Sequence, residues 1–238
     1  MMIDIVLPVY NHERFIQKTI ESILNQTINN WKLIIVNDGS TDKSREIAEK
    51  YISDNIILIN HEKNKRLPSA LNTGFKFSTS PFLTWISSDC WCNNNFLEKL
   101  YITLCNADDS VGMVYSNFNC INESNDIICK YQLNYPQKHN NTFDLFQSLL
   151  DKNCCGASFM YKRKCMDTIG LYDESLEGCE DYDYWIRISE HFKFMFIDDI
   201  LYNYRTQHKD RLAYSIYDKI RKNEMIVKSN AWKRRGIK

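Results

Sequence analysis

The first ninety or so residues alternate between short, continuously apolar segments and segments with helical periodicity. This alternation restricts the fold more than any other feature. Strands without polar alternation, separated by helices, indicate a mostly parallel sheet covered on both faces. The expected strands cover residues 3–9, 31–36, 56–59 and 82–86, and the expected helices cover 12–27, 41–52 and 70–77.

Polar residues follow three of these expected strands. Tyr10 and Asn11 come after the first strand, Asp38 after the second and Asp89 after the fourth. Ligands of open α/β sheets bind outside the carboxyl ends of the strands, so these residues predict a ligand site at that edge. No G-x-G-x-x-G follows the first strand and no G-x-x-x-x-G-K-[ST] occurs, so the sequence does not support a dinucleotide or P-loop site.

The second half of the chain has a different pattern, with more strands that favour antiparallel pairing. Strands are expected over 111–120, 127–133, 156–161, 194–197 and 200–204, and helices over 93–106, over 143–150, from Glu180 and, as a basic tail, from about Arg211. No linker or repeat divides the chain. We therefore expect one α/β domain over residues 1–210, with a mostly parallel, Rossmann-like nucleotide-binding half and a mixed or antiparallel acceptor half. A helical tail over 211–238 is expected to pack on this domain or extend from it.

Charge and composition exclude several classes of protein. Lys+Arg and Asp+Glu both total 30, so the basic excess typical of nucleic-acid binders is missing. No apolar stretch is long enough to span a membrane, and the first residues lack the basic region of a signal peptide. The nine cysteines lack zinc-site spacing and are interpreted as reduced thiols. We expect a soluble, cytoplasmic protein without a nucleic-acid partner.

Two aspartates at strand ends have both a structural and a functional interpretation. Asp38 lies in a strand-to-helix turn with Gly39, and as an exposed carboxylate it would accept the imide N–H of a uracil-like base. Asp89 would hold a divalent ion that bridges two phosphates, although one carboxylate alone is a weak indication of a metal.

Glu180 and Asp181 open a helix behind a glycine-containing loop. Acids in a first turn favour the helix dipole, which explains them without any function. Alternatively, one of two adjacent acids acts as a general base whose pKa the other raises.

Arg205 and His208 follow the last expected strand. They belong either to an edge strand with a basic turn or to a cationic site for a leaving diphosphate. The basic tail is interpreted as a solvated helix face or as a contact with a membrane surface or partner.

The order of motifs along the chain resembles glycosyltransferase family 2. The resemblance covers about residues 3–208 and rests on these segments: Val6-Leu7-Pro8-Val9-Tyr10-Asn11-His12-Glu13, Val36-Asn37-Asp38-Gly39-Ser40-Thr41-Asp42, Asn64 with Ala70-Leu71-Asn72-Thr73-Gly74, Asp89, and Glu180-Asp181-Tyr182-Asp183-Tyr184-Trp185.

This resemblance implies a GT-A fold and an inverting transfer of a sugar from a nucleotide diphosphate, most simply a UDP-sugar, to a glycan, lipid-linked or protein acceptor. It implies Asp181 as the base beside Glu180, Mn²⁺ or Mg²⁺ at Asp89 with His208, and Arg205 at the diphosphate. The nucleotide-binding residues that it implies are Pro8, Val9, Tyr10, Asn11, Glu13, Asp38, Arg66 and Ser88.

The chain departs from the family pattern at two places. Ser87-Ser88-Asp89-Cys90 stands where many members have Asp-x-Asp-Asp, and Arg66 stands where glycine is common. Because two of the three acids of this motif are missing, a second hypothesis remains open, namely a nucleotide-sugar-binding or scaffolding protein without catalysis. A third, a nucleotidyltransferase, would need a glycine-rich basic loop after the first strand, and Tyr10-Asn11-His12-Glu13 is not one.

Overall fold

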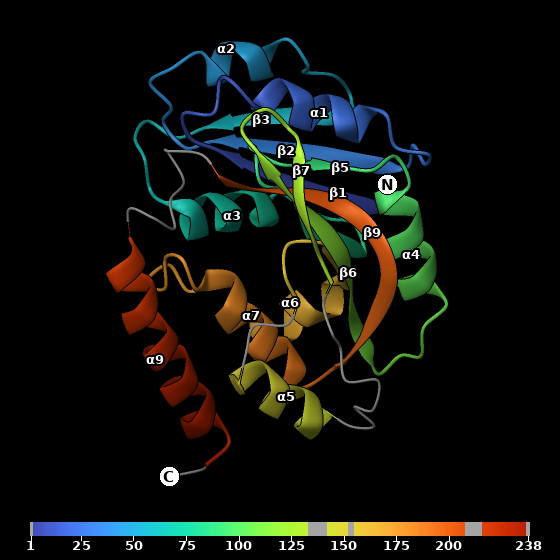
Figure 1. Ribbon diagram of the computed structural model, residues 1–238, viewed down its shortest axis with the longest axis vertical. Coiled ribbons are helices and arrows are strands. Elements are labelled where there is room, and N and C mark those ends of the chain that lie inside the picture. The colour runs from blue at the N-terminus through green and yellow to red at the C-terminus, as the bar shows by residue number, and fades with distance from the viewer. Residues whose placement is uncertain (1, 133–141, 152–154, 208–215, 237–238) are drawn as a thin grey trace.

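The computed structural model describes residues 2–132, 142–151, 155–207 and 216–236. Its strands form one nine-stranded sheet, in the order β3-β2-β1-β4-β8-β6-β9-β5 with β7 paired to β6 (Figure 1). The strands are β1 (Ile3–Val9), β2 (Trp31–Asn37), β3 (Ile56–Asn60), β4 (Phe82–Trp85), β5 (Trp91–Cys92), β6 (Val111–Asn122), β7 (Ile127–Tyr131), β8 (Phe159–Lys162) and β9 (Lys193–Gln207).

The helices lie on both sides of this sheet. In Figure 1, α1 and α2 lie above the first three strands and α3 lies below them. The helices are α1 (Ile16–Leu24), α2 (Ser44–Glu49), α3 (Leu67–Lys76), α4 (Phe96–Cys105), α5 (Thr142–Asp151), α6 (Arg163–Ile169), α7 (Glu180–Ser189) and α9 (Tyr217–Arg234).

The first four strands pair in parallel, as the alternation of strands and helices predicts. β1 lies between β2 and β4, with Ile3 opposite both Trp31 and Phe82. All seven residues of β1 are buried, including the charged Asp4. The Asp4 carboxylate accepts hydrogen bonds from the backbone N–H groups of Thr79 and Ser80, which satisfy it inside the core.

The remaining strands form a mixed half, also as expected. β8 is antiparallel to β4 and β6, whereas β9 runs parallel to β6. The predicted break between strands 194–197 and 200–204 is wrong. β9 is continuous, and the register shifts between Ser116 and Phe118 of the partner strand accommodate the intervening residues as an irregularity.

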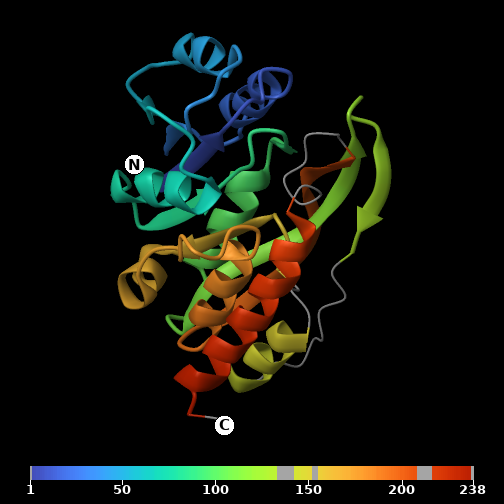
Figure 2. The same ribbon diagram turned by 90° about the vertical axis from the view of Figure 1, so that its left-hand side faces the viewer.

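The helix α9 packs against the second, mixed half of the fold. Figure 2 shows α9 beside α7 and α5, while the β6–β7 hairpin extends at the upper right of the view. Asn223, Val227 and Ala231 are the buried residues of α9. The predicted domain boundary at residue 210 falls outside the described residues and stays a prediction.

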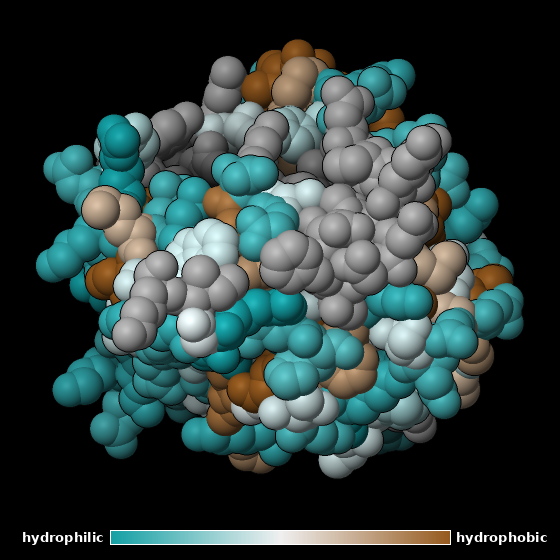
Figure 3. All heavy atoms as spheres, turned by 90° about the horizontal axis from the view of Figure 1, so that it is seen from below, coloured by the Kyte–Doolittle hydropathy of each residue, from teal (hydrophilic) through white to brown (hydrophobic). Residues whose placement is uncertain are grey.

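Neither the described helices nor the face of the molecule in Figure 3 carries a long apolar segment or patch. No helix among them combines the length and apolar content that crossing a membrane requires. On the face seen in Figure 3, the described residues are mostly hydrophilic, and the hydrophobic ones lie in small separate groups. Scattered groups of this kind are normal on folded domains.

Candidate functional site

A cavity of about 440 Å³ lies at the carboxyl ends of β1, β2 and β4. The opposite wall comes from β9, the start of α7 and the start of α9, so both halves of the fold contribute to it. This is the sheet edge at which the sequence predicts a ligand site. Ten of the predicted site residues line the cavity: Pro8, Val9, Tyr10, Asp38, Arg66, Ser88, Asp89, Glu180, Asp181 and Arg205.

Two other predicted residues that the structure describes, Asn11 and Glu13, do not line it. Asn11 has a positive φ of 53°, and its side-chain oxygen accepts a hydrogen bond from Thr41 N at 2.8 Å. The Glu13 carboxylate accepts from Lys43 N at 2.9 Å. Both side chains therefore hold the loop after β1 against the loop after β2. His208 lies outside the described residues.

Asp38 is buried, so the expectation of an exposed carboxylate is wrong. Its exposed fraction is 3%, because His61 at the end of β3 lies against it. Asp38 Oδ1 is 2.6 Å from His61 Nδ1 and accepts a hydrogen bond from Lys65 N at 2.9 Å. Gly39, at φ +70°, lets the turn approach the 63–64 backbone, where a Cβ would come within 2.6 Å of Lys63 C.

Asp89 is held by the two residues that replace acids of the family motif. Ser87 Oγ donates to Asp89 Oδ1 at 2.5 Å, and Cys90 Sγ donates to the same oxygen at 3.1 Å. Burial, with the nearby Asp89 charge, raises the pKa of the Cys90 thiol well above its usual value. Cys90 is therefore a neutral donor and not a thiolate ligand.

The side chains around Asp89 determine which kind of metal ion could bind there. Within the part of the chain that the structure describes, no three His, Cys, Asp or Glu side chains gather as a metal site. Mg²⁺ commonly uses one or two carboxylates together with substrate phosphates and water. Asp89 fits that arrangement as a single carboxylate.

The two acids at the start of α7 have raised pKa values. Burial, followed by the Asp181 charge, raises the pKa of Glu180 to about 8. Burial raises the pKa of Asp181 to about 6. Glu180 Oε2 accepts from Gly178 N at 2.6 Å and shapes the preceding loop, whereas Asp181 is only half-buried. Of the two, Asp181 is the acid that loses its proton first near neutral pH.

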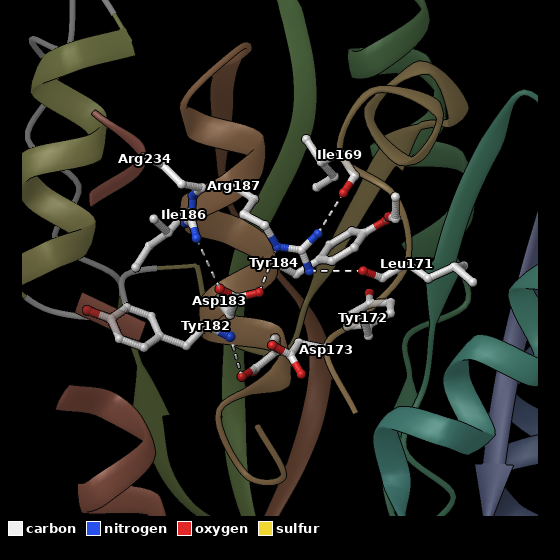
Figure 4. A network of polar contacts seen from close by, with 12 residues as sticks. Ile169, Leu171, Tyr172, Asp173, Tyr182, Asp183, Tyr184, Ile186, Arg187 and Arg234 are labelled. Atoms are coloured by element: carbon white, nitrogen blue, oxygen red, sulfur yellow. Dashed lines mark hydrogen bonds and ion pairs between the residues drawn. The ribbon is translucent and has the colours of Figure 1, made fainter. Parts of the chain in front are cut away.

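A network of polar contacts fixes the helix that carries these acids (Figure 4). Arg187 Nε donates to Asp183 Oδ2 at 2.7 Å, one turn earlier in α7. The Arg187 guanidinium also donates to the carbonyl oxygens of Ile169 and Leu171 at 2.9 and 3.0 Å. Arg234 of α9 lies 3.9 Å from Asp183 Oδ1. These contacts tie α7 to α6, to the following loop and to α9.

Arg205 is buried and makes several contacts within the protein. Its Nε donates to the Asp89 carbonyl oxygen at 2.8 Å, and its Nη2 donates to Asn125 Oδ1 at 2.6 Å. Its Nη1 donates to the Asn122 carbonyl oxygen. The guanidinium carbon also lies 4.3 Å from the centre of the Phe15 ring. Arg205 thus ties β9 to the Asp89 loop and the β6–β7 turn, and its contact with a diphosphate stays a prediction.

Arg66 stands at the rim of the cavity with a backbone conformation that favours glycine. Its φ is 77° at the residue before α3, and its side chain is exposed. Nη1 lies 3.8 Å from Oε1 of Glu177, a buried carboxylate whose Oε2 is 2.6 Å from Lys219 Nζ in α9. The pair links the start of α3 to the loop before Glu180.

Three residues in or next to the cavity had no predicted role in the site, namely His12, His61 and Glu177. His12 lines the cavity, and its Nδ1 is 2.7 Å from Ser88 Oγ. Its place directly after Tyr10 and Asn11 was an available signal. His61 follows β3, so the strand-end rule that selected Asp38 also applies to it. Glu177 gave no signal, because only the folded loop brings it to the cavity.

Comparisons with known proteins agree with this architecture. The sequence model of the family described as Glycosyl transferase family 2 matches residues 4–170. The uncharacterized glycosyltransferase RP339 of Rickettsia prowazekii (strain Madrid E) is 31% identical over 212 residues, which are 89% of this chain and 64% of that protein. The chain therefore spans less than two thirds of that relative's length.

Two solved structures share the fold at low sequence identity. S. aureus TarS 1-349 in complex with UDP-GlcNAc has a TM-score of 0.74 and 16% identity, covering 95% of this chain and 67% of that one. Mannosyltransferase PcManGT from Pyrobaculum calidifontis, in complex with GDP-Man and Mn²⁺, has a TM-score of 0.66 and 17% identity, covering 97% and 69%. These likenesses confirm the expected α/β fold class.

Proposed function

The chain belongs to glycosyl transferase family 2, with the GT-A fold, and we propose that it is an inverting glycosyltransferase that uses a UDP-sugar. The observation that carries this proposal is the meeting of Asp38, Asp89 and Asp181 on one cavity. The bound nucleotide-sugars of TarS and PcManGT support a nucleotide diphosphate donor. UDP is chosen because Asp38 can accept the imide N–H of uracil.

The proposed reaction is a single displacement at the anomeric carbon of the donor sugar. The acceptor oxygen forms the new bond while the bond from the anomeric carbon to the diphosphate oxygen breaks, and its electron pair leaves with the diphosphate. Asp181 takes the proton of the acceptor hydroxyl as a general base. Attack opposite the leaving group inverts the configuration.

Mn²⁺ or Mg²⁺ would be held by Asp89 together with the donor's phosphates, with His208 as a further candidate ligand. The ion supplies Lewis-acid stabilisation of the charge on the departing diphosphate. Arg66, which lines the cavity with an exposed side chain, is proposed as a cation for the same phosphates.

The acceptor and location are proposed only as classes. The acceptor hydroxyl belongs to a glycan, a lipid-linked sugar or a protein, and the site lies in the cytoplasm. The described cysteines are free thiols, Cys90 and Cys92 among them, which supports a reducing compartment. The exposed Arg221, Lys222 and Met225 of α9 would suit a weak membrane-surface contact.

A binding screen tests the class of protein directly. UDP, GDP, CDP and ADP are compared by the shift in unfolding temperature that they cause, with and without Mn²⁺. The proposal predicts that UDP stabilises the protein most and that Mn²⁺ increases the shift. Stabilisation by none of the four nucleotides would contradict it.

The second candidate, a nucleotide-sugar-binding protein without catalysis, rests on the loss of acids around Asp89. Both candidates predict UDP binding, so turnover separates them. Slow hydrolysis of UDP-sugars by the wild-type protein, abolished in Asp181→Asn, supports the enzyme. Binding without hydrolysis or transfer to any acceptor in a glycan panel supports the second candidate.

A further inference from the structure

His61 and Asp38 form a buried pair behind the wall of the cavity. His61 Nδ1 is 2.6 Å from Asp38 Oδ1, and the exposed fractions of the two residues are 9% and 3%. An ionised carboxylate only accepts hydrogen bonds, so Nδ1 is the ring nitrogen that carries a proton toward it. The imidazole therefore acts as a hydrogen-bond donor that holds this oxygen of Asp38 in place.

One further hydrogen bond to each side chain fixes the orientation of His61 and Asp38. His61 Nε2 is 2.9 Å from Thr73 Oγ1 in α3, which restrains rotation of the ring. Lys65 N donates to the same Asp38 oxygen that His61 contacts, at 2.9 Å. Two donors thus converge on Oδ1, which fixes the rotamer of the carboxylate.

The other oxygen of Asp38 is the one left for a ligand. Oδ2 has no hydrogen-bond donor among the described residues, and Asp38 lines the cavity. Oδ2 keeps some exposure at the cavity wall, so a ligand N–H that enters the cavity can donate to it.

We propose that His61, anchored by Thr73, is a positioning residue that makes the nucleotide pocket select a base with a ring N–H and reject one with a bare ring nitrogen. Uracil presents N3–H to Oδ2, whereas the N3 of cytosine presents a lone pair to a fixed negative charge. This inference rests on the proposed function, because it assumes that a nucleotide base reaches Asp38.

Loss of the His61 donor changes the orientation of Asp38. Without Nδ1–H, only Lys65 N still donates to Oδ1, and the carboxylate can turn away from the base. A carboxylate that turns away loses the hydrogen bond from N3–H of uracil, and it also ceases to repel the lone pair on N3 of cytosine. The expected result is weaker UDP binding together with unchanged or stronger CDP binding, a change that simple damage to the pocket does not produce.

Two amide substitutions test the donor position. The side-chain nitrogen of Asn in His61→Asn can replace Nδ1, whereas the longer Gln in His61→Gln places its nitrogen nearer to the position of Nε2. We expect His61→Asn to keep the ratio of UDP to CDP affinity within about threefold of wild type, and His61→Gln to lower it by about tenfold or more. Calorimetry gives the affinities, and circular dichroism confirms that each variant is folded.

Thr73→Val provides a second test of the inference in case His61→Gln does not fold. It keeps the imidazole and removes its anchor, and it should lower the same ratio by roughly threefold. Equal ratios in the two His61 variants, or an unchanged ratio in a folded Thr73→Val protein, would overturn the inference while leaving the proposed function intact. Failure of wild-type protein to bind UDP would instead overturn the proposed function.

Discussion

Asn72 and the backbone of Tyr172 exchange two hydrogen bonds across 100 positions of the sequence. Asn72 Nδ2 donates to the Tyr172 carbonyl oxygen and Tyr172 N donates to Asn72 Oδ1, both at 2.9 Å. Asn72 lies in α3, which packs on β1 and β2, and Tyr172 lies in the loop that leads to α7. This pair therefore connects the parallel half of the fold with the element that carries Asp181.

The first prediction is that Asn72→Ala destabilises the protein. The substitution leaves two buried backbone groups of Tyr172 without partners, so the free energy of unfolding should fall by about 2 kcal/mol or more. Urea denaturation measures it. Asn94→Ala, at an exposed position, is the control and should change stability by less than about 0.5 kcal/mol. Equal effects of the two substitutions would show that the pair is not a structural link.

The second prediction concerns stability and pH. Glu180 and Asp181 have pKa values raised to about 8 and about 6 from ordinary values of 4.5 and 3.8. Between the ordinary and raised values the folded protein holds protons that the unfolded chain has released, so their burial lowers stability as pH rises from about 4 to about 8.

A neutral side chain at position 180 binds and releases no proton, so it removes the contribution of Glu180 to this pH dependence of stability. Glu180→Gln should therefore be more stable than wild type at pH 8, by on the order of 1 kcal/mol, and should lose that advantage at pH 4. Thermal unfolding at the two pH values measures the difference. The opposite result would be a Glu180→Gln protein whose stability relative to wild type is lower at pH 8 than at pH 4. It would mean that the acid stabilises the helix chiefly through the helix dipole.

The pattern of strands and helices was predictable because the spacing of apolar residues within each segment indicates a strand or a helix without reference to distant residues. β1 and β2 are predominantly apolar, and both lie where expected. β5 was missed because it has two residues, and the short α6 was missed because it follows β8 without a turn signal. The continuity of β9 depends on pairing with β6, which no local pattern encodes.

The third prediction corrects the sequence-based view of Asp38. Asp38→Ala should weaken UDP binding by about 10- to 150-fold, because it removes a hydrogen bond to a charged group. It should also lower the free energy of unfolding by about 1–3 kcal/mol, since His61 Nδ1 and Lys65 N lose their acceptor. Calorimetry and urea denaturation measure the two effects, with exposed Asp54→Ala as control. Unchanged UDP affinity would remove Asp38 from the base pocket.

The site residues differ in how far the sequence could predict them. Asp38, Asp89 and Asp181 were predictable because each lies at a strand end or helix start that faces the expected edge. Asn11 and Glu13 share the same motif but turn toward the neighbouring loop, where backbone N–H groups need acceptors. The direction of a loop side chain depends on such partners, which the sequence does not show.

The fourth prediction tests the role of Asp89. Mn²⁺ should increase the affinity of the wild-type protein for UDP, and Asp89→Asn should abolish that increase while UDP without metal binds as before. Calorimetry with and without Mn²⁺ measures both. UDP affinity in the wild type that does not depend on Mn²⁺ would contradict the metal role, and Arg66 would then be the first residue to examine as the phosphate-binding cation.

The most direct test of the proposed mechanism is the turnover number of Asp181→Asn measured beside its affinity for UDP. Because Asp181 acts only when the acceptor hydroxyl attacks, kcat should fall by about 10²–10⁴-fold while UDP affinity stays near wild type. The wild-type rate should also fall as pH drops through about 6, where Asp181 takes up its proton. Glu180→Gln, which mimics an acid that is largely protonated at neutral pH, should be milder. Near wild-type kcat in Asp181→Asn would contradict the account, and loss of kcat in Glu180→Gln alone would transfer the role of base to Glu180.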